Sequence, residues 1–418
     1  MAFVSHMEIP VYSQPEVLNE LTDDFRECFG DVRQFIHFRE IVSALDTSEK
    51  RSIAHLNSTI IGHANQSSMN RFLSSRIDTD LMFDIMVEEI NRIEEDGIIA
   101  IDDTIVEKNG KDIEAAGYIY DHSMGKTVWG IQFATAVFSG RYGIYPVSAI
   151  VYERKEKIDD EKKEKKVKEY RSKIDIQKSV IDKCISSGLH FSAVTGDIWY
   201  FTKGLVSFLN IKSLSWVFQS KGNRKVKIKG RWTTLDSLPL DYEDSEIVKI
   251  SGNAYNVWEI VGRMKGIGEV KIVVSEGING RRYYATNMIG WDFLKIMETY
   301  LRRWDIEVLH RDLKQDGLGH IFLRKLCKTE LYLRLIVTGR VLLEISSIRS
   351  LNNYMKVDGR VEIRKRWISF EFLESLFRGF KKYGYHFLQT LKKSITDPYR
   401  SARGFLCDHV NLHKGGAI

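Results

Sequence analysis

Acidic side chains at three well-separated places in the chain are of the type that metal-dependent phosphoryl chemistry requires. Asp102 and Asp103 end the apolar run GIIAIDD, Asp197 ends the run FSAVTGD, and Glu307 lies in a segment with helical periodicity. Mg²⁺ prefers oxygen ligands, and two ions about 4 Å apart can hold both the attacking and the leaving oxygen of an in-line displacement. A fold that gathered these carboxylates would therefore provide the donors for two metal ions.

Each acid also has a purely structural interpretation. Asp102 or Asp103 could begin a turn, Asp197 could cap the helix expected after it, and Glu307 could pair with Arg303 for about 0.3–0.5 kcal/mol. Neighbouring side chains on a strand point to opposite faces, so only one of Asp102 and Asp103 can point into a given site. The residues alone leave open which of the two would do so.

The segment around Glu307 is expected to form one long helix over residues 291–317 with two distinct faces. With about 100° per residue, four polar side chains fall within roughly 60° of arc, and Arg311 lies beside them: Tyr300, Arg303, Glu307 and Lys314. The opposite face is apolar and should be buried: Ile306, Leu309 and Leu313. The polar face thus combines one carboxylate with cations and a phenol, which suits a metal ion and the phosphates beside it.

The elements that must position these acids follow the order of an RNase H-like α/β fold. Hydrophobic runs and periodicity predict β-β-β-α-β-α, then a β-rich stretch, then the helix of Glu307. The β-rich stretch is punctuated by glycines, which predicts a small antiparallel subdomain inserted into the core. The expected strands cover 97–104, 128–140, 142–154 and 190–197; the expected helices include 174–187 and 291–317; the β-rich stretch covers 211–287.

Helical regions are expected on both sides of this core. Residues 52–75 have the outline of a helix-turn-helix, and Arg71 on its second helix suits a phosphate or base-edge contact, although a simple helical hairpin fits equally well. The C-terminal helices at 369–393 are a candidate dimerisation surface. The expected domains are a helical N-terminal DNA-binding domain at 1–95, the first part of the core at 96–210, the β insertion at 211–288, the Glu307 helix of the core at 289–325 and a helical C-terminal region at 326–418.

The composition is that of a globular protein with a mild basic bias. The 418 residues include 62 Lys and Arg against 56 Asp and Glu, a net charge of +6 that is compatible with an anionic partner. The basic stretch at 221–231 could contact a DNA backbone or form a solvated hairpin, and the charged stretch at 154–173 reads as a solvated helix or flexible crossover. Four widely spaced cysteines, no visible secretory signal and no apolar run of membrane length predict a cytoplasmic protein without a membrane partner.

The spacing Tyr300-x2-Arg303-x3-Glu307-x6-Lys314 is similar, without gaps, to the Tyr-Arg-Glu-Lys signature of a class of prokaryotic insertion-sequence transposases. These DDE transposases have an RNase H-like catalytic core that is often interrupted by a β-strand insertion. The segment IDDTIVEKNGK at 101–111 resembles the region of their first Asp, and GDIWYFTKG at 196–204 resembles that of their second. The resemblance covers about residues 50–320.

This resemblance implies that Asp103, Asp197 and Glu307 are the metal ligands, with Asp103 favoured over Asp102 because Thr104 follows it. They would bind two Mg²⁺ ions, with Mn²⁺ as a substitute. Other polar residues would hold DNA: Tyr300, Arg303 and Lys314 from the signature, with Arg311 and Arg71 added by the patterns above. An aromatic of the insertion would stack on a displaced base, with four candidates: Trp232, Trp258, Tyr283 and Tyr284.

The implied reaction is cut-and-paste DNA transposition. Water attacks a phosphodiester at the end of the element, and the freed 3′-OH then attacks a phosphodiester of the target DNA. Because two ends must be paired, a homodimer is expected. Two other classes of protein fit less well: a non-catalytic, transposase-derived DNA-binding regulator, and an RNase H-like nuclease selective for branched DNA.

Overall fold

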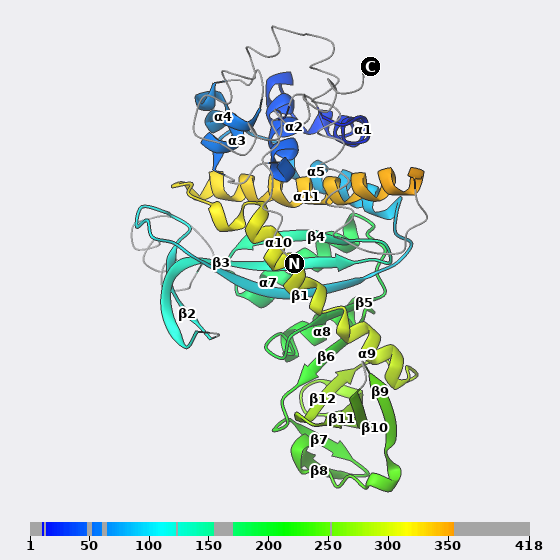
Figure 1. The fold of residues 1–418 in the computed structure, drawn as a ribbon. Coiled ribbons are helices and arrows are strands. Elements are labelled where there is room, and N and C mark those ends of the chain that lie inside the picture. The colour runs from blue at the N-terminus through cyan, green and yellow to red at the C-terminus, as the bar shows by residue number, and fades with distance from the viewer. Residues whose placement is uncertain are drawn as a thin grey trace, which may run out of the picture. The chain divides into compact units, whose positions relative to one another are not determined.

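The computed structural model describes residue 11 and the ranges 14–47, 52–60, 65–122, 124–153, 170–250 and 253–354 (Figure 1). The fold is mixed α/β. The chain divides into two compact units. The second unit is made of residues 94–105 and 132–310. The candidate metal ligands all lie in it: Asp102, Asp103, Asp197 and Glu307. The first unit is made of the remaining residues.

The second unit is built on a sheet with the strand order β4-β3-β1-β5-β6 at one end. The strand β5 (Ala193–Gly196) pairs in parallel with both β1 (Ile98–Glu107) and β6 (Ser215–Ser220). The strands β3 (Lys126–Ser139) and β4 (Ile144–Val151) form an antiparallel pair. Ile98 to Ile101 are all buried, as expected for parallel strands covered on both faces. The helices of this part are α7 (Lys173–Ser186) and α8 (Lys203–Ile211).

The same sheet continues into an antiparallel region. The strand β12 pairs antiparallel with β6, and the order continues through β11, β10, β7 and β8, with β9 paired to β10. Sequence patterns place residues 215–220 in the insertion, but β6 pairs in parallel with β5, so the antiparallel strands begin only after it. Their bounds are β7 (Lys225–Ile228), β8 (Arg231–Thr234), β9 (Glu246–Ile250), β10 (Asn253–Met264), β11 (Gly268–Gly277) and β12 (Gly280–Thr286).

The expected helix over 291–317 is wrong in one respect: it is two helices. Helix α9 (Phe293–Leu301) and helix α10 (Trp304–Asp316) are separated by a turn at Arg302 and Arg303. Arg302 Nη1 donates hydrogen bonds to the carbonyl oxygens of Ser139 (3.0 Å) and Gly140 (3.2 Å) at the end of β3. These tertiary bonds fix the turn, so the polar arc that assumed one straight helix applies only within α10.

Helix α9 is held by an apolar cluster on the antiparallel strands. Phe293, Ile296, Met297 and Tyr300 are buried on α9 against residues of β6, β10, β11 and β12: Val217, Val257, Val273 and Tyr284. Burying four such side chains contributes several kcal/mol at about 25 cal/mol per Å² of apolar surface. This packing fixes the position of the residue that begins the Tyr-Arg-Glu-Lys spacing.

A buried carboxylate closes the β3–β4 hairpin. Glu94 is almost fully buried and accepts hydrogen bonds from the backbone N–H groups of Arg141 (2.7 Å), Tyr142 (2.9 Å) and Gly143 (2.8 Å) and from Tyr145 Oη (2.9 Å). Buried polar groups need such partners, because an unpaired one costs the free energy of its lost hydration. The hairpin that Arg302 contacts is therefore itself anchored.

The first unit is mainly helical, as expected. The helix α11 (Leu326–Tyr354) packs against α1, α2 and α5, and α3 packs against α2 and α4. Within the described ranges no helix combines the length and the apolar character needed to cross a membrane. The remaining bounds are α1 (Glu16–Asp23), η1 (Arg26–Cys28), α2 (Val32–Thr47), α3 (Ile53–Thr59), α4 (Gln66–Phe72), α5 (Thr79–Asn91), β2 (Gly117–Asp121) and η4 (Leu318–His320).

Local capping explains two of these helix starts. Ser52 accepts a hydrogen bond from the N–H of His55 at the start of α3, and Asn65 accepts one from the N–H of Ser67 at the start of α4. The two expected helices of the 52–75 segment are thus confirmed. Gly62, the expected turn, lies outside the described residues, as do the helices expected at 369–393.

Free thiols occupy three described cysteine positions, in agreement with the absence of a Cys-x-x-Cys motif. Cys28 and Cys184 are buried, and burial raises the pKa of each thiol to about 12. They pack as small apolar residues, as expected. Cys327 differs, because its side chain is exposed. Cys407 lies outside the described residues.

Candidate active site

Asp102 and Asp197 lie at corresponding positions, directly after the last pair between the parallel strands β1 and β5. That last pair is Ile101 and Gly196; Asp102 is the next residue of β1, and Asp197 is the residue that follows the end of β5. Adjacent strands are about 4.8 Å apart, so the two backbones bring the carboxylates close together. Gly196 permits this approach, because a Cβ there would lie 2.9 Å from Ile101 Cγ1 and 3.1 Å from the Ile101 carbonyl oxygen.

The two carboxylates affect each other electrostatically. The pKa of Asp102 is raised from an ordinary 3.8 to about 7, chiefly by burial. The hydrogen bond from the N–H of Asp103 and the charge of Arg303 oppose this rise, and the charges of Asp197 and Asp103 add to it. Asp197 Oδ1 accepts a hydrogen bond from the N–H of Trp199 (2.8 Å), so the turn after β5 holds this carboxylate. Asp197 therefore both caps its turn and faces a second acid.

Asp103 has a different environment. Its Oδ1 accepts hydrogen bonds from Lys173 Nζ (2.9 Å) and Tyr200 Oη (3.1 Å), and its Oδ2 accepts one from Gln132 Nε2 (2.5 Å). The side chains of Lys173 and Asp103 are 16% and 18% exposed, so this is a largely buried ion pair. The resemblance favours Asp103 as the metal ligand, but protein donors hold both of its oxygens, whereas Asp102 faces Asp197.

Tyr200 is well suited to donate a hydrogen bond to Asp103, the acid that Lys173 also binds. Its side chain is fully buried, and burial together with the charges of Asp103 and Asp102 raises the pKa of its phenol far above the usual range. The phenol therefore keeps its proton. Its N–H also donates to Asp197 Oδ1 at 3.3 Å.

Arg303 interacts with Glu307 and with Asp102. Its Nη2 donates to Glu307 Oε1 at 2.8 Å, in an i,i+4 pair whose side chains are 17% and 39% exposed. Its charge also lowers the pKa of Asp102. The ion pair that the pattern suggested as a structural alternative for Glu307 is thus present. The guanidinium of Arg303 thus binds Glu307 and also acts electrostatically on Asp102.

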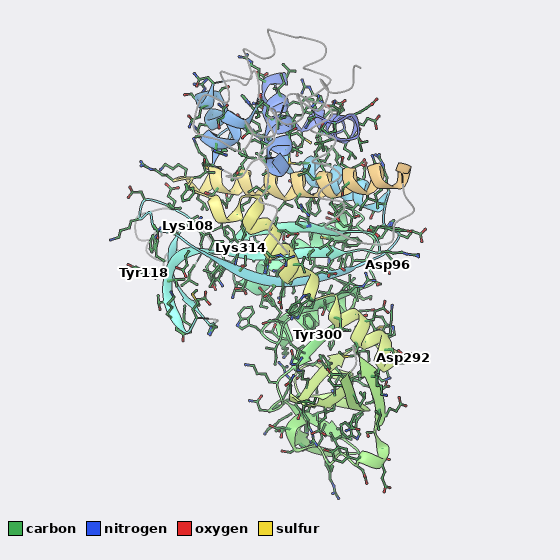
Figure 2. All side chains as sticks on the ribbon, in the orientation of Figure 1. Asp96, Lys108, Tyr118, Asp292, Tyr300 and Lys314 are labelled. Carbon is green, nitrogen blue, oxygen red and sulfur yellow. The ribbon has the colours of Figure 1, made fainter. Side chains whose placement is uncertain are left out.

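Tyr300 is buried on α9 (Figure 2). Its Oη donates to Gln219 Oε1 at 2.9 Å, its ring meets that of Tyr284 edge-on at 4.8 Å, and Arg303 lies 5.8 Å from its ring centroid. Burial raises the pKa of this phenol, and the nearby Arg303 charge opposes the rise. The Tyr300 side chain is thus packed in the interior, with its ring next to the Arg303 guanidinium, and is not exposed to solvent.

The acids have the chemistry for a hard cation but are not gathered around one point. Among the described residues, no group of three or more His, Cys, Asp or Glu side chains lies close enough to hold a metal ion. Glu307 is bound by Arg303. The donors nevertheless fit Mg²⁺ or Mn²⁺, because all are carboxylates. A divalent cation would also offset the repulsion by Asp197 and Asp103 that, in addition to burial, raises the pKa of Asp102.

The other expected DNA-binding residues belong to the first unit. Lys314 (Figure 2) and Arg311 are exposed on α10, and Arg71 is exposed on α4. In the second unit the four candidate stacking aromatics separate clearly, because three are buried and one is exposed: Trp258, Tyr283 and Tyr284 are buried, and Trp232 on β8 is 51% exposed.

Several residues at the site were not expected from the sequence. Lys173, Gln132 and Tyr200 surround Asp103, and Arg302 fixes the turn before α10. Lys173 gives no separate signal, because it ends a stretch of alternating charges. The Trp-Tyr pair shortly after Asp197 could have been noticed as a large aromatic group next to a candidate ligand.

Two family models match this chain. One, for DDE superfamily endonucleases, matches residues 24–234, and the other, for the archaeal putative transposase ISC1217, matches residues 140–355. Each covers about half of the chain, and the chain belongs to the DDE superfamily. The chain is also 27% identical over 229 residues to a probable transposase for insertion sequence element IS701 from Microchaete diplosiphon. That match covers 53% of this chain and 58% of the relative, so it spans less than two thirds of the relative.

Two solved structures align over most of the chain. The piggyBac transposase synaptic complex with hairpin DNA aligns with a TM-score of 0.46 and 10% identity, over 92% of this chain and 82% of that chain. The Drosophila P element transposase strand transfer complex aligns with a TM-score of 0.22 and 11% identity, over 87% and 72%. At these TM-scores the likeness adds nothing to the argument from fold and site.

Proposed function

We propose that this protein is an insertion-sequence transposase that cuts DNA at the ends of its element and joins the freed 3′-OH to target DNA. The observation that carries the proposal is the position of Asp102 and Asp197, side by side beyond the last pair of β1 and β5, in a member of the DDE superfamily. Metal-dependent phosphoryl transfer requires acids from distant parts of the chain to meet at one place, as these two do at the end of the paired region of two adjacent strands.

The strand order supports an RNase H-like core with an insertion. The order β4-β3-β1-β5-β6, with β1, β5 and β6 parallel, supports such a core, in which β6 is a strand that the sequence patterns assign to the insertion. The antiparallel strands from β7 to β12 precede the helix of Glu307. The proposed core therefore has the first two acids on adjacent strands and the third on a helix that follows the insertion.

The proposed metal ligands are Asp102, Asp197 and Glu307, with Asp102 in place of Asp103. The contacts of Asp103 with Lys173, Tyr200 and Gln132 support this choice. Bound Mg²⁺ or Mn²⁺ would activate water and stabilise the charge that develops on the phosphate. Ligation by Glu307 would compete with Arg303, whose guanidinium would then be available to a DNA phosphate.

The DNA-binding role rests on cations and aromatics placed by the fold. Arg303 is held next to the acids by Tyr300, and Arg311, Lys314 and Arg71 are exposed cations. These residues would bind phosphates of the element end, which orients the scissile bond. The spacing of Tyr300, Arg303, Glu307 and Lys314 is the basis for placing the protein in the Tyr-Arg-Glu-Lys class.

The β7–β8 hairpin is a second proposed DNA contact. Its two-residue turn, Lys229 and Gly230, has positive φ at both positions (46° and 85°), which gives a tight hairpin. The exposed side chains of this hairpin are mostly basic, with one tryptophan: Lys225, Lys227, Lys229, Arg231 and Trp232. A basic strip with one exposed aromatic suits a DNA backbone with a displaced base.

The proposed partners are the DNA ends of the element, the target DNA and a second copy of the chain that pairs the two ends. The test uses a supercoiled plasmid that carries the gene with its native flanking DNA, incubated with purified protein and Mg²⁺ or Mn²⁺. We expect cleavage at the element ends by wild type and none by Asp102→Asn, Asp197→Asn or Glu307→Gln. Specific binding without cleavage would favour the regulator, and cutting of branched DNA without regard to end sequence would favour the nuclease.

A further inference from the structure

We propose that Lys173 and Tyr200 are positioning residues that bind Asp103 in order to fix the separation of Asp102 and Asp197. This inference rests on the proposed function, because it assigns Asp103 a role beside the metal ligands. It gives a purpose to a largely buried ion pair that has no part in ligation. A tight constraint is needed there, because small displacements of catalytic groups cost large factors in rate.

The first link runs through α7. Lys173 Nζ donates to Asp103 Oδ1 at 2.9 Å and also lies 4.2 Å from the centroid of the Trp199 ring. The N–H of Trp199 in turn donates to Asp197 Oδ1 at 2.8 Å. One ammonium group thus connects the residue next to Asp102 with the turn that holds Asp197. Cations over a tryptophan face are attracted by its quadrupole, so the second contact is favourable as well.

The second link is a single residue. Tyr200 donates through its Oη to Asp103 Oδ1 (3.1 Å) and through its N–H to Asp197 Oδ1 (3.3 Å). Its ring is fully buried, so its position is fixed by packing. The end of β1 and the turn after β5 are therefore joined twice, once by an ion pair and once by a phenol.

A third set of contacts fixes the main chain of Asp102. Gln177, one helical turn after Lys173, is buried and donates through Nε2 to the carbonyl oxygens of Asp102 (3.3 Å) and Thr135 (2.9 Å). Residues four apart lie on one face of a helix. The same face of α7 thus holds the backbone of Asp102 through Gln177 and the side chain of Asp103 through Lys173.

The test compares Mn²⁺ binding by full-length variants, measured from the signal of free Mn²⁺ in electron paramagnetic resonance, and cleavage of the native-flank plasmid as a function of Mn²⁺ concentration. Tyr200→Phe removes one hydrogen bond without changing charge. The double variant Lys173→Met/Asp103→Asn removes the ion pair while preserving the net charge, which keeps a buried charge from being left alone. Lys178→Met is the control, because Lys178 forms a more exposed pair with Asp175 on the same helix (3.7 Å).

We expect both test variants to need roughly ten-fold more Mn²⁺ for half-saturation, the usual effect of removing a residue that orients metal ligands. Cleavage should recover at saturating Mn²⁺, and the control should match wild type. Unchanged Mn²⁺ affinity in both variants would overturn the positioning role. So would tighter binding by Tyr200→Phe, because a ligating Asp103 would be freed from a competing donor.

The outcome for wild type separates this inference from the function beneath it. Wild type that neither binds Mn²⁺ nor cuts the plasmid would overturn the proposed function and the positioning role together. Wild type that binds Mn²⁺ and cuts, with unaltered half-saturation in the variants, would overturn the positioning role alone. Circular dichroism of each variant verifies that its fold is retained.

Discussion

Asp102 and Asp197 stand one residue beyond the same pair, Ile101 and Gly196, of two parallel strands. Their relation is thus set by main-chain hydrogen bonds, which are harder to displace than side-chain contacts. The arrangement disfavours the ionised form of Asp102, because burial removes its hydration and Asp197 repels its charge. Both effects raise the pKa of Asp102. This raised pKa leads to the first prediction.

Asp102→Asn should stabilise the metal-free protein at neutral pH. The folded-state pKa of Asp102 is about 7 against an ordinary 3.8, so between these values the native state binds the extra proton and stability falls as pH rises. The advantage of the variant should be near zero at pH 4 and approach about 4 kcal/mol well above pH 7, at about 1.4 kcal/mol for each pKa unit. Urea unfolding at several pH values measures it. Added Mg²⁺ should stabilise only the wild type, and a constant difference at all pH values would contradict the assignment.

Gly196→Ala should damage both the fold and the site. The added Cβ would lie 2.9 Å from Ile101 Cγ1, so β1 and β5 must separate next to the two aspartates. Overpacking of this kind costs about 1–3 kcal/mol. We expect a lower thermal midpoint and weaker Mn²⁺ binding than in Gly290→Ala, whose Cβ would enter open space. If Gly196→Ala behaved like wild type, β1 and β5 would be able to accommodate the added Cβ without disturbing the two aspartates.

Neutralising the β7–β8 hairpin should weaken DNA binding in a salt-dependent way. In the triple variant Lys225→Gln/Lys227→Gln/Lys229→Gln, the slope of log affinity against log salt should fall by about 0.9 for each phosphate that the hairpin no longer neutralises. Fluorescence anisotropy with native-flank DNA at several salt concentrations gives the slope. Lys249→Gln, an exposed lysine on β9, serves as the control. Equal slopes for the triple variant and wild type would remove the hairpin from the interface.

Glu94→Ala should destabilise the protein strongly, because it leaves three backbone N–H groups and a buried phenol without their acceptor. Such an absence costs about 3 kcal/mol or more in total. Glu95→Ala, at the exposed neighbouring position, should stay within about 0.5 kcal/mol of wild type. Chemical denaturation compares the two. Equal stability of both variants would show that the β3–β4 hairpin holds its shape without this carboxylate.

Most strands and most helices could be predicted from the sequence because burial controls them. The strand β2 was not predicted, and only one of its five residues is buried. The residues from Ile98 to Ile101 are buried because both faces of β1 are covered. Such a strand has a continuous apolar run, which can be recognised in the local sequence. The position of Asp197 directly after its apolar run was predictable for the same reason.

The remaining features depend on contacts between distant residues. The turn between α9 and α10 depends on the bonds of Arg302 to Ser139 and Gly140, more than 160 positions away, and no helical periodicity reports them. Alternation showed that Asp102 and Asp103 face opposite ways but could not say which faces Asp197. That depends on Lys173, which contacts Asp103 across 70 positions of sequence.

The turn at Arg302 and Arg303 also determines where this protein can tolerate insertions and deletions. One residue added or removed between Leu301 and Trp304 would rotate α10 by about 100° relative to α9 and turn Glu307 away from its present direction. The same change in the Lys229–Gly230 turn would alter only the tip of a hairpin. We therefore expect a length change of one residue to be tolerated in the Lys229–Gly230 turn and to disrupt the site when it falls in the Arg302–Arg303 turn.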